Sequence, residues 1–160
     1  MAERVESARE KFASIFLYQF GERVRPIIDR VVSELEFTYS RRTGRMKSIL
    51  WKGEEYCYFR PDVGLFTLGR VAAQVILDML PPPNLRAILQ DDVGEFIAQG
   101  RNAFAKHVVD VDPSLVPEDE IILVDTQDRL LGVGRLVLPA SEVKAFSRGV
   151  AVKTRKGFEA

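Results

Sequence analysis

The sequence is poor in the residues that usually build metal and redox sites. Among its 160 residues it has one cysteine, Cys57, and one histidine, His107. An intramolecular disulfide is therefore impossible, and a zinc site of Cys and His ligands cannot be assembled from this chain. We expect Cys57 to be an inert thiol in a core strand rich in aromatic residues, and His107 to be a partly buried structural residue. No metal and no cofactor is expected.

Net charge and long apolar runs are also missing. Lys plus Arg and Asp plus Glu both number 23, so the formal net charge is zero and gives no reason to expect a polyanionic partner. No apolar run approaches the ~20 residues that span a bilayer. The charged N-terminus lacks the apolar core of a signal peptide, and no Walker or dinucleotide glycine loop occurs. We expect a cytoplasmic protein without a membrane partner.

The first half of the chain reads as helices around a small antiparallel sheet. Apolar residues recur at helical spacing over residues 3–19 and 25–35, after which the period changes to two. Thr67 is expected to cap a helix that ends near Leu80. Strands are expected over residues 36–40, 46–51 and 55–60. The stiff Pro81-Pro82-Pro83 segment is the best domain boundary, so we predict an α/β domain over residues 1–80.

The second half reads as a small, strongly curved barrel over residues 84–160. Gly132 and Gly134 lie one pleat apart in a strand, a pattern typical of a bulge, a bend or a close backbone approach. Residues 150–155 alternate, which predicts a basic outer face that carries Lys153 and Arg155. A brief helix after Asp91 or Asp92 is expected to end at Gly100. The expected strands are 85–89, 102–111, 121–124, 130–138 and 150–155, with a short helix over 141–146. The predicted fold class is α+β.

Although the chain has no net charge, its basic residues gather in two clusters. The first consists of Arg41, Arg42, Arg45, Lys47 and Lys52, with Tyr39 and Trp51 on its flanks. The second consists of Lys144, Arg148, Lys153, Arg155 and Lys156. Cations on twisted strands can follow a phosphate backbone, and nearby aromatic rings can stack on bases. Charge alone leaves two interpretations open. The clusters can form a nucleic-acid-binding surface, or they can be a solvated hairpin and an edge strand whose lysines prevent pairing with another strand.

The loop at residues 99–102 and three pairs of acidic residues are further candidates. Gly100 at a helix end can present backbone groups to a ligand, with Arg101 adding charge, or it can be an ordinary glycine cap. The acidic pairs could hold a metal or do acid–base work, but each lies beside a predicted turn or helix start, where Asp serves as a cap. These pairs are Asp91/Asp92, Asp110/Asp112 and Asp125/Asp128. We assign no catalytic residue and no metal ligand.

Several segments together carry a family resemblance. Residues 96–106, 117–125, 130–134 and 149–155, in this order and spacing, resemble the PUA domain, a small pseudo-barrel that binds RNA. Upstream, residues 18–21, 40–45 and 59–68 are similar to the segments that precede the PUA domain in archaeal tRNA-guanine (archaeosine) transglycosylases. Nearly the whole chain then resembles the RNA-binding tail of that enzyme. The first half is also similar to the pre-PUA domains of other archaeal and eukaryotic PUA proteins.

The resemblance implies a β pseudo-barrel that meets RNA at its glycine loop and its C-terminal strand. The RNA-binding residues implied are Gly100, Arg101, Asn102, Lys106, Lys144, Arg148, Lys153, Arg155 and Lys156. A second candidate RNA surface is Arg41, Arg42, Arg45 and Lys47. The implied partner is structured RNA, with tRNA, at its acceptor stem and 3′ end, favoured over rRNA. A separately encoded modification enzyme is a further implied partner.

The sequence also limits the chemistry. It has neither the length for the transglycosylase's catalytic (β/α)₈ barrel nor the cysteines of that enzyme's zinc site, so base exchange is not expected. We therefore predict a non-catalytic RNA binder, standing alone or assisting a tRNA-modifying enzyme. The alternatives left open are a ribosome assembly or translation factor, an enzyme with a carboxylate-only metal site, and a protein-interaction subunit that uses its aromatic N-terminal helix.

Overall fold

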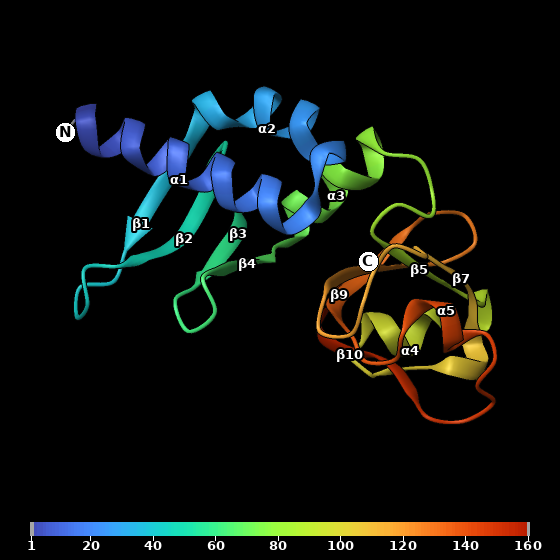
Figure 1. The fold of residues 1–160 in the computed structure, drawn as a ribbon. Helices are drawn as coiled ribbons and strands as arrows, with labels where there is room; N and C mark the ends of the chain where they lie inside the picture. Colours follow the sequence, from blue (N-terminus) through green and yellow to red (C-terminus); the bar gives the residue numbers. More distant parts are fainter. Residues whose placement is uncertain (1, 160) are drawn as a thin grey trace. The chain divides into compact units, whose positions relative to one another are not determined.

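The computed structural model describes residues 2–159, which divide into two compact units, one ending at Met79 and the other starting at Leu80. The first unit is a four-stranded antiparallel sheet with helices, and the second is a six-stranded sheet that curls into a nearly closed barrel (Figure 1). This confirms the predicted α+β class, with an antiparallel sheet first and a β pseudo-barrel second. Among the described residues, no helix is long and apolar enough to cross a membrane.

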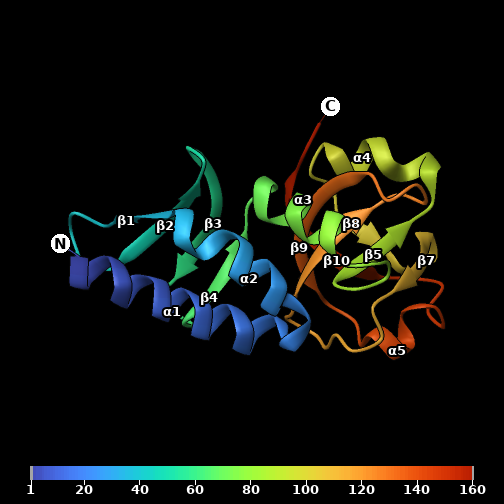
Figure 2. The same cartoon turned by 90° about the horizontal axis from the view of Figure 1, so that it is seen from above.

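In the first unit, helices pack on a meander of neighbouring strands in the order β1-β2-β3-β4. Helices α1 and α2 contact each other and lie on one face of this sheet (Figure 2), and α3 contacts β3. The elements are α1 (Ala2–Phe20), α2 (Arg25–Val31), β1 (Leu35–Tyr39), β2 (Met46–Trp51), β3 (Glu54–Arg60), β4 (Leu65–Leu68) and α3 (Arg70–Met79). The helix expected over 25–35 is shorter, because a 3-10 turn, Val32–Glu34, leads into β1.

The core of this unit is aromatic because α1 repeats phenylalanine at every fourth position. Phe12, Phe16 and Phe20 are almost fully buried, and the ring centroids of Phe12 and Phe16 lie 5.0 Å apart. Phe66 of β4 and Tyr56 of β3 complete the cluster, with 5.5 Å between the centroids of Phe12 and Phe66. Residues four apart lie on the same face of a helix, so this spacing fixes α1 onto the sheet.

The expected role of Thr67 as a helix cap is wrong. Thr67 lies in β4, opposite Tyr58, and is 8% exposed. The helix begins only at Arg70, after Gly69, where a Cβ would approach the Tyr56 carbonyl oxygen to 2.8 Å. The Gln19 side chain completes the outer edge of β4 by donating to the Phe66 carbonyl and accepting from the Phe66 N–H, both at 2.8 Å. The short run at 65–68 gave no strand signal because it is too brief to show a period of two.

The second unit forms a curved sheet in the order β6-β10-β9-β8-β5-β7. Strands β5 and β8 are parallel, and every other neighbouring pair is antiparallel. The strands are β5 (Arg86–Leu89), β6 (Ala103–Phe104), β7 (Val108–Val111), β8 (Glu120–Val124), β9 (Leu130–Leu136) and β10 (Val150–Gly157), with helices α4 (Gly94–Ala98) and α5 (Ala140–Val143). The β8 strand is buried along its whole length and forms the centre of the core.

The single strand expected over 102–111 is wrong, because the chain turns in its middle. A 3-10 turn, Ala105–His107, separates β6 from β7, and these two strands lie at the two ends of the sheet order. A sheet whose first and last strands are joined by three residues must curl, which nearly closes the barrel. His107 lies in this turn and is half-buried, while Cys57 is fully buried in β3.

The expected close backbone approach at Gly132 and Gly134 is confirmed. A Cβ on Gly132 would lie 2.6 Å from the Lys156 carbonyl oxygen, and a Cβ on Gly134 would collide with the Lys153 carbonyl oxygen. Both glycines therefore allow β9 to cross close to β10, where the register shifts between Thr154 and Lys156. The bend gives β10 its curvature and determines which of its side chains reach solvent.

Candidate nucleic-acid interface

The loop after α4 ends the helix with a double hydrogen bond. The Gly100 N–H donates to the Ile97 carbonyl at 2.9 Å, and the Arg101 N–H donates to the Phe96 carbonyl at 3.1 Å. Gly100 has φ +97°, the left-handed conformation that this type of cap requires. The N–H groups of Gly100 and Arg101 are therefore used inside the loop, and recognition at this place falls to the exposed side chains that follow.

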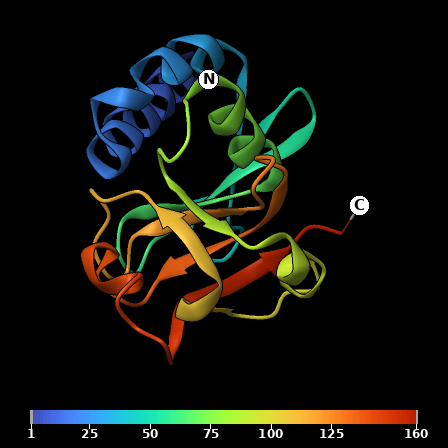
Figure 3. The ribbon, with the colours of Figure 1, turned by 90° about the vertical axis from the view of Figure 1, so that its right-hand side faces the viewer.

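This loop lies directly against strand β10. The side-chain Oδ1 of Asn102 accepts a hydrogen bond from the Thr154 N–H at 3.1 Å. A Cβ on Gly157 would collide with the Ala98 carbonyl oxygen at the end of α4. Figure 3 shows yellow α4 beside the C-terminal end of red β10. Segments 50 residues apart in sequence thus form one surface, which we name the loop–strand face: residues 100–106 and 148–156.

Most cations of the loop–strand face have no counter-charge. Within the described residues, Arg101, Lys106, Arg148, Lys153 and Lys156 are exposed and form no ion pair. The Arg101 guanidinium carbon lies 5.6 Å from the centroid of the Phe96 ring, and the Phe96 side chain is 48% exposed. An exposed ring beside a guanidinium offers a flat apolar surface next to a positive charge, the combination on which an unstacked base can lie.

Two of the predicted RNA-binding cations are held by carboxylates. Lys144 Nζ lies 3.0 Å from Asp110 Oδ1 at the surface. The Arg155 guanidinium forms a two-point contact with Glu120, with Nη1 2.7 Å from Oε1. The Glu120 side chain is only 6% exposed, so Arg155 compensates a nearly buried negative charge. Lys153 and Arg155 are exposed, as the alternation predicts, but Ala151, which was expected on the same outer face, is buried.

The first basic cluster lies in the other unit. Arg41, Arg42, Arg45 and Lys47 are exposed around the β1–β2 hairpin, where the Ser40 N–H donates to the Arg45 carbonyl at 2.8 Å. The sequence pattern missed two further cations close to this hairpin, Arg4 and Lys11 of α1. It also missed the exposure of Phe96, which was read only as a residue of a short helix.

Five residues of the acidic pairs accept hydrogen bonds or form ion pairs: Asp91, Asp110, Asp112, Asp125 and Asp128. Asp91 accepts from the Thr126 N–H at 3.0 Å and from the Thr126 hydroxyl at 2.7 Å. The hydroxyl hydrogen bond, aided by the backbone one, holds the pKa of Asp91 below its ordinary value. Asp128 accepts two hydrogen bonds from the fully buried Arg86, and Asp125 pairs with Arg129 at 2.7 Å.

The remaining acids have similar roles. Asp112 accepts from the Leu85 N–H at 2.8 Å and from Ser114, and Asp110 accepts from the Val111 N–H and pairs with Lys144. Across residues 2–159, no group of three or more His, Cys, Asp or Glu side chains is arranged to hold a metal ion. The acidic side chains therefore stabilise turns and buried positive charge.

Comparison with known proteins assigns both units. Residues 86–158 match the PUA domain family, and residues 10–83 match the patch-forming domain C2 of tRNA-guanine transglycosylase. The tRNA-guanine(15) transglycosylase of Thermococcus onnurineus is 39% identical over 142 residues, which cover 89% of this chain and 24% of that protein. The Thermococcus kodakarensis enzyme is 38% identical over 95% of this chain and 26% of its own length. The chain thus spans about a quarter of these curated relatives.

Solved structures confirm the fold across both units. A hypothetical protein from Pyrococcus horikoshii superposes with a TM-score of 0.74 at 20% identity, covering 93% of this chain and 89% of that one. A conserved PUA domain protein from Thermoplasma acidophilum gives a TM-score of 0.67 at 17% identity, covering 96% and 89%. PUA and C2 domains are RNA-binding modules and not catalytic ones. The chain therefore combines a patch-forming domain C2 of tRNA-guanine transglycosylase, over residues 10–83, with a PUA domain, over residues 86–158.

Proposed function

We propose that this chain binds structured RNA without catalysing a reaction, and that its RNA is tRNA, held at the acceptor stem and the 3′ end. It acts as a stand-alone RNA-binding protein or beside a separately encoded tRNA-modifying enzyme in the cytoplasm. The observation that carries the proposal is the loop–strand face, where uncompensated cations from two distant segments lie together. The Asn102–Thr154 hydrogen bond joins those segments.

The charges of this face suit a phosphate backbone. Arg101, Lys153 and Lys156 are exposed and free of carboxylate partners among the described residues. Cationic side chains that approach a phosphate backbone release the counterions bound to it. Lys and Arg residues without a carboxylate partner therefore give an affinity for RNA that does not depend on its sequence. Lys144 and Arg155 contribute less in this proposal, because each already has a carboxylate partner.

In this proposal the chain distinguishes its RNA from a blunt duplex by the unpaired end of the RNA. Phe96 and Arg101 present a ring and a guanidinium beside the glycine loop. Every nucleobase has a flat apolar face, so an exposed ring can stack on an unpaired base but cannot reach bases inside a duplex. A duplex that ends in a single strand, as the tRNA acceptor arm does, supplies phosphates and unstacked bases to the same face.

The proposal of a non-catalytic role rests on the state of the acidic and nucleophilic side chains. Asp91, Asp110 and Asp112 accept hydrogen bonds from backbone amides, and Asp125 and Asp128 pair with arginines. Cys57 is buried in the core of the first unit. A general base needs to reach a substrate proton within hydrogen-bond distance. The chain's own activity on RNA is therefore expected to be binding alone.

Equilibrium binding to tRNA tests the proposal. The full chain is titrated with intact tRNA, with tRNA lacking its single-stranded 3′ end, and with a blunt RNA duplex of equal length. We expect the intact tRNA to bind most tightly. Arg101→Glu and Lys153→Glu are each expected to weaken binding by roughly tenfold or more, because each replaces a phosphate contact with a repulsive charge.

The control is Arg25→Glu, which makes the same charge change in the other unit. Arg25 is exposed and pairs with Glu22 at 2.8 Å, and an ion pair between two exposed side chains contributes little to stability, so the variant should remain folded. This variant should bind within about twofold of the parent. If Arg101→Glu and Lys153→Glu bind tRNA as tightly as the parent, the loop–strand face is not the RNA site.

A further inference from the structure

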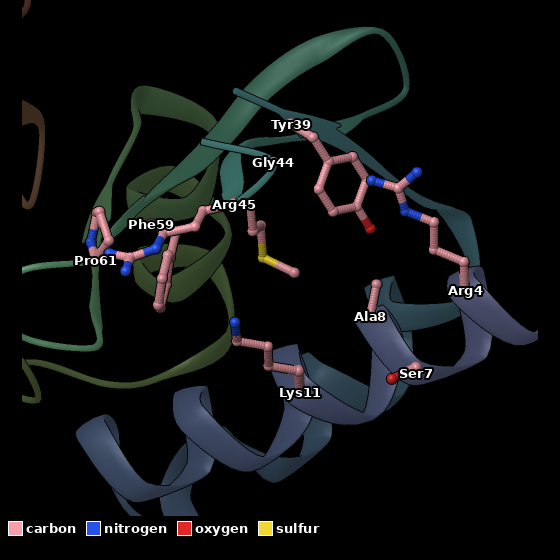
Figure 4. Close-up of a pocket in the computed structure, with 10 residues that line it drawn as sticks. Arg4, Ser7, Ala8, Lys11, Tyr39, Gly44, Arg45, Phe59 and Pro61 are labelled. Atoms are coloured by element: carbon pink, nitrogen blue, oxygen red, sulfur yellow. The ribbon is translucent and has the colours of Figure 1, made fainter. Parts of the chain in front are cut away.

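The first unit contains an open hollow of about 590 Å³ between the start of α1 and the far end of its sheet. It is lined by Arg4, Ser7, Ala8 and Lys11 of α1, by Tyr39 of β1, by Gly44 and Arg45 of the hairpin, by Met46 of β2, and by Phe59 and Pro61 at and just after the end of β3. Figure 4 labels all of these residues except Met46. This volume lies within the roughly 300–1,000 Å³ range of sites for small ligands. Nothing in the loop–strand face of the second unit contributes to it.

The hollow exists because the row of phenylalanines along α1 does not extend to the N-terminal part of the helix. At every fourth position the helix reads Arg4, Ala8, Phe12, Phe16 and Phe20. The three phenylalanines fill the space between helix and sheet, but Ala8, although buried, is too small to do so. The sheet continues past it with Met46 and Phe59, so a space remains with an apolar floor.

Three cations line this space without a counter-charge. Figure 4 shows Lys11 pointing into the hollow, with Arg4 and Arg45 on either side. The lining includes no carboxylate among the described residues. The nearby acids Glu6 and Asp62 pair instead with Arg9 and Arg60, which do not line it. Like charges gathered in a concave site repel one another, so such a site gains free energy when an anion binds.

Aromatic rings stand beside these cations. The Arg4 guanidinium carbon lies 3.8 Å from the centroid of the Tyr39 ring, and Lys11 Nζ lies 4.5 Å from that of Phe59. In the described part of the chain these are the only recorded side-chain partners of Arg4 and Lys11. Both rings are half-buried at the edge of the hollow, and a cation on such a ring can turn to an anion that enters. The ring face it leaves is then available for stacking.

We propose that this hollow binds a phosphate-bearing nucleotide unit, with the phosphate held by Lys11 and Arg45 and the base against one of the two lining rings, Tyr39 or Phe59. A simple anion would use the cations but not the rings, and an uncharged aromatic compound would use the rings but not the cations. A nucleotide uses both. The unit can be a free mononucleotide or one nucleotide of a single-stranded RNA, since the two share this chemistry.

Equilibrium dialysis of the full chain against labelled nucleoside 5′-monophosphates tests the site. We expect saturable binding of the nucleoside monophosphates. Unphosphorylated nucleosides and inorganic phosphate should each be poor competitors for this site. Lys11→Gln and Arg45→Gln should each weaken it about tenfold, the loss expected for one charge-assisted hydrogen bond. Ala8→Leu should abolish it by filling the hollow, with no change in charge.

Arg25→Gln is the matched control, because it removes an exposed cation of the same unit that lies outside the hollow, and it should bind as the parent does. Thermal melting of each variant establishes that it is folded. The proposal is overturned if no mononucleotide binds saturably, if inorganic phosphate displaces nucleotides at equal concentration, or if Ala8→Leu and Lys11→Gln both retain full affinity.

A second arm separates the two sources of the ligand. A single-stranded RNA trinucleotide that binds more tightly than a mononucleotide, and that loses this affinity in Lys11→Gln, identifies RNA as the source. Equal affinity of the two identifies a free nucleotide. If this site fails, Arg101→Glu and Lys153→Glu still weaken tRNA binding. If the proposed tRNA site fails, Lys11→Gln still weakens mononucleotide binding, so the two failures can be told apart.

Discussion

Asn102 and Thr154 lie 52 residues apart in sequence, yet the Asn102 side-chain oxygen accepts the Thr154 N–H at 3.1 Å. The bond ties the loop after α4 to the closing strand β10. Both segments carry uncompensated cations, so this contact sets the spacing between the two halves of the loop–strand face. A site of this kind depends on the geometry of its support as well as on its charges.

Replacing Asn102 tests this support. Asn102→Ala leaves the Thr154 N–H without its partner, and should lower the free energy of unfolding by about 0.5–1.5 kcal/mol. It should also weaken tRNA binding, because the loop is less well positioned. Asn102→Asp keeps an acceptor for the Thr154 N–H but adds a negative charge to the face.

The two Asn102 variants therefore separate positioning from charge. Urea unfolding should give Asn102→Asp near-parental stability, whereas its tRNA affinity should fall at least as far as that of Asn102→Ala. Equal tRNA affinity of all three proteins would show that Asn102 has no part in binding.

Arg155 should matter more for stability than for RNA binding. Its partner Glu120 has a side chain only 6% exposed, so Arg155→Gln leaves a nearly buried carboxylate without its cation. We expect the free energy of unfolding to fall by about 1–3 kcal/mol, measured by urea denaturation. The paired change Arg155→Met with Glu120→Leu should recover most of this loss. No recovery in the pair would mean that the residues contribute mainly by other contacts.

The bend of β9 can be tested with two glycines of the same unit. Gly134→Ala places a methyl group against the Lys153 carbonyl, so it should destabilise the protein by about 1–3 kcal/mol. Gly94→Ala is the control. There a Cβ would meet only the Leu131 side chain, at 3.5 Å, and alanine favours the helix α4. Thermal melting should place the Gly94→Ala midpoint at or above that of the parent, and a lower midpoint would refute the packing argument.

Asp91 gives a stability contribution that depends on pH. Its pKa is lowered mainly by the hydrogen bond from the Thr126 hydroxyl, then by the one from the Thr126 N–H. A carboxyl whose folded pKa is depressed stabilises the protein above its unfolded pKa, near the ordinary value of 3.8, and loses that contribution as pH falls through the folded pKa.

Thr126→Val removes the hydroxyl and so should narrow the stability difference between pH 7 and pH 3, measured by urea denaturation. Thr43→Val is a suitable control, since it removes an exposed hydroxyl from the hairpin of the first unit. A parental pH dependence in Thr126→Val would contradict the assignment of the shift to Thr126.

Much of the fold was readable from periodicity, because most elements bury one face. The strand at Met46–Trp51 has the predicted bounds, and Gly132 and Gly134 mark the bend they predicted. Periodicity failed where an element is too short or is broken by tertiary structure. Strand β4 has four residues, and the break at Ala105–His107 is imposed by closure of the barrel.

The candidate site was readable in outline only. Charge density marked the cations, but it could not show that Arg155 faces Glu120 or that Lys144 faces Asp110, because these partners lie 34 or 35 residues away in sequence. Nor could it show that Arg86, the one charged residue of β5, is fully buried and donates to Asp128. Contacts between distant segments decide which charges remain available to a ligand.

The salt dependence of tRNA binding tests the central claim most directly. The affinity of the parent and of the double variant Arg101→Gln, Lys153→Gln is measured over a series of salt concentrations. We predict that the logarithm of the parent's affinity falls linearly with the logarithm of salt concentration, and that the double variant's slope is smaller by about two, roughly one for each phosphate contact removed. An affinity that does not weaken with salt, or equal slopes for the two proteins, would contradict phosphate recognition by the loop–strand face.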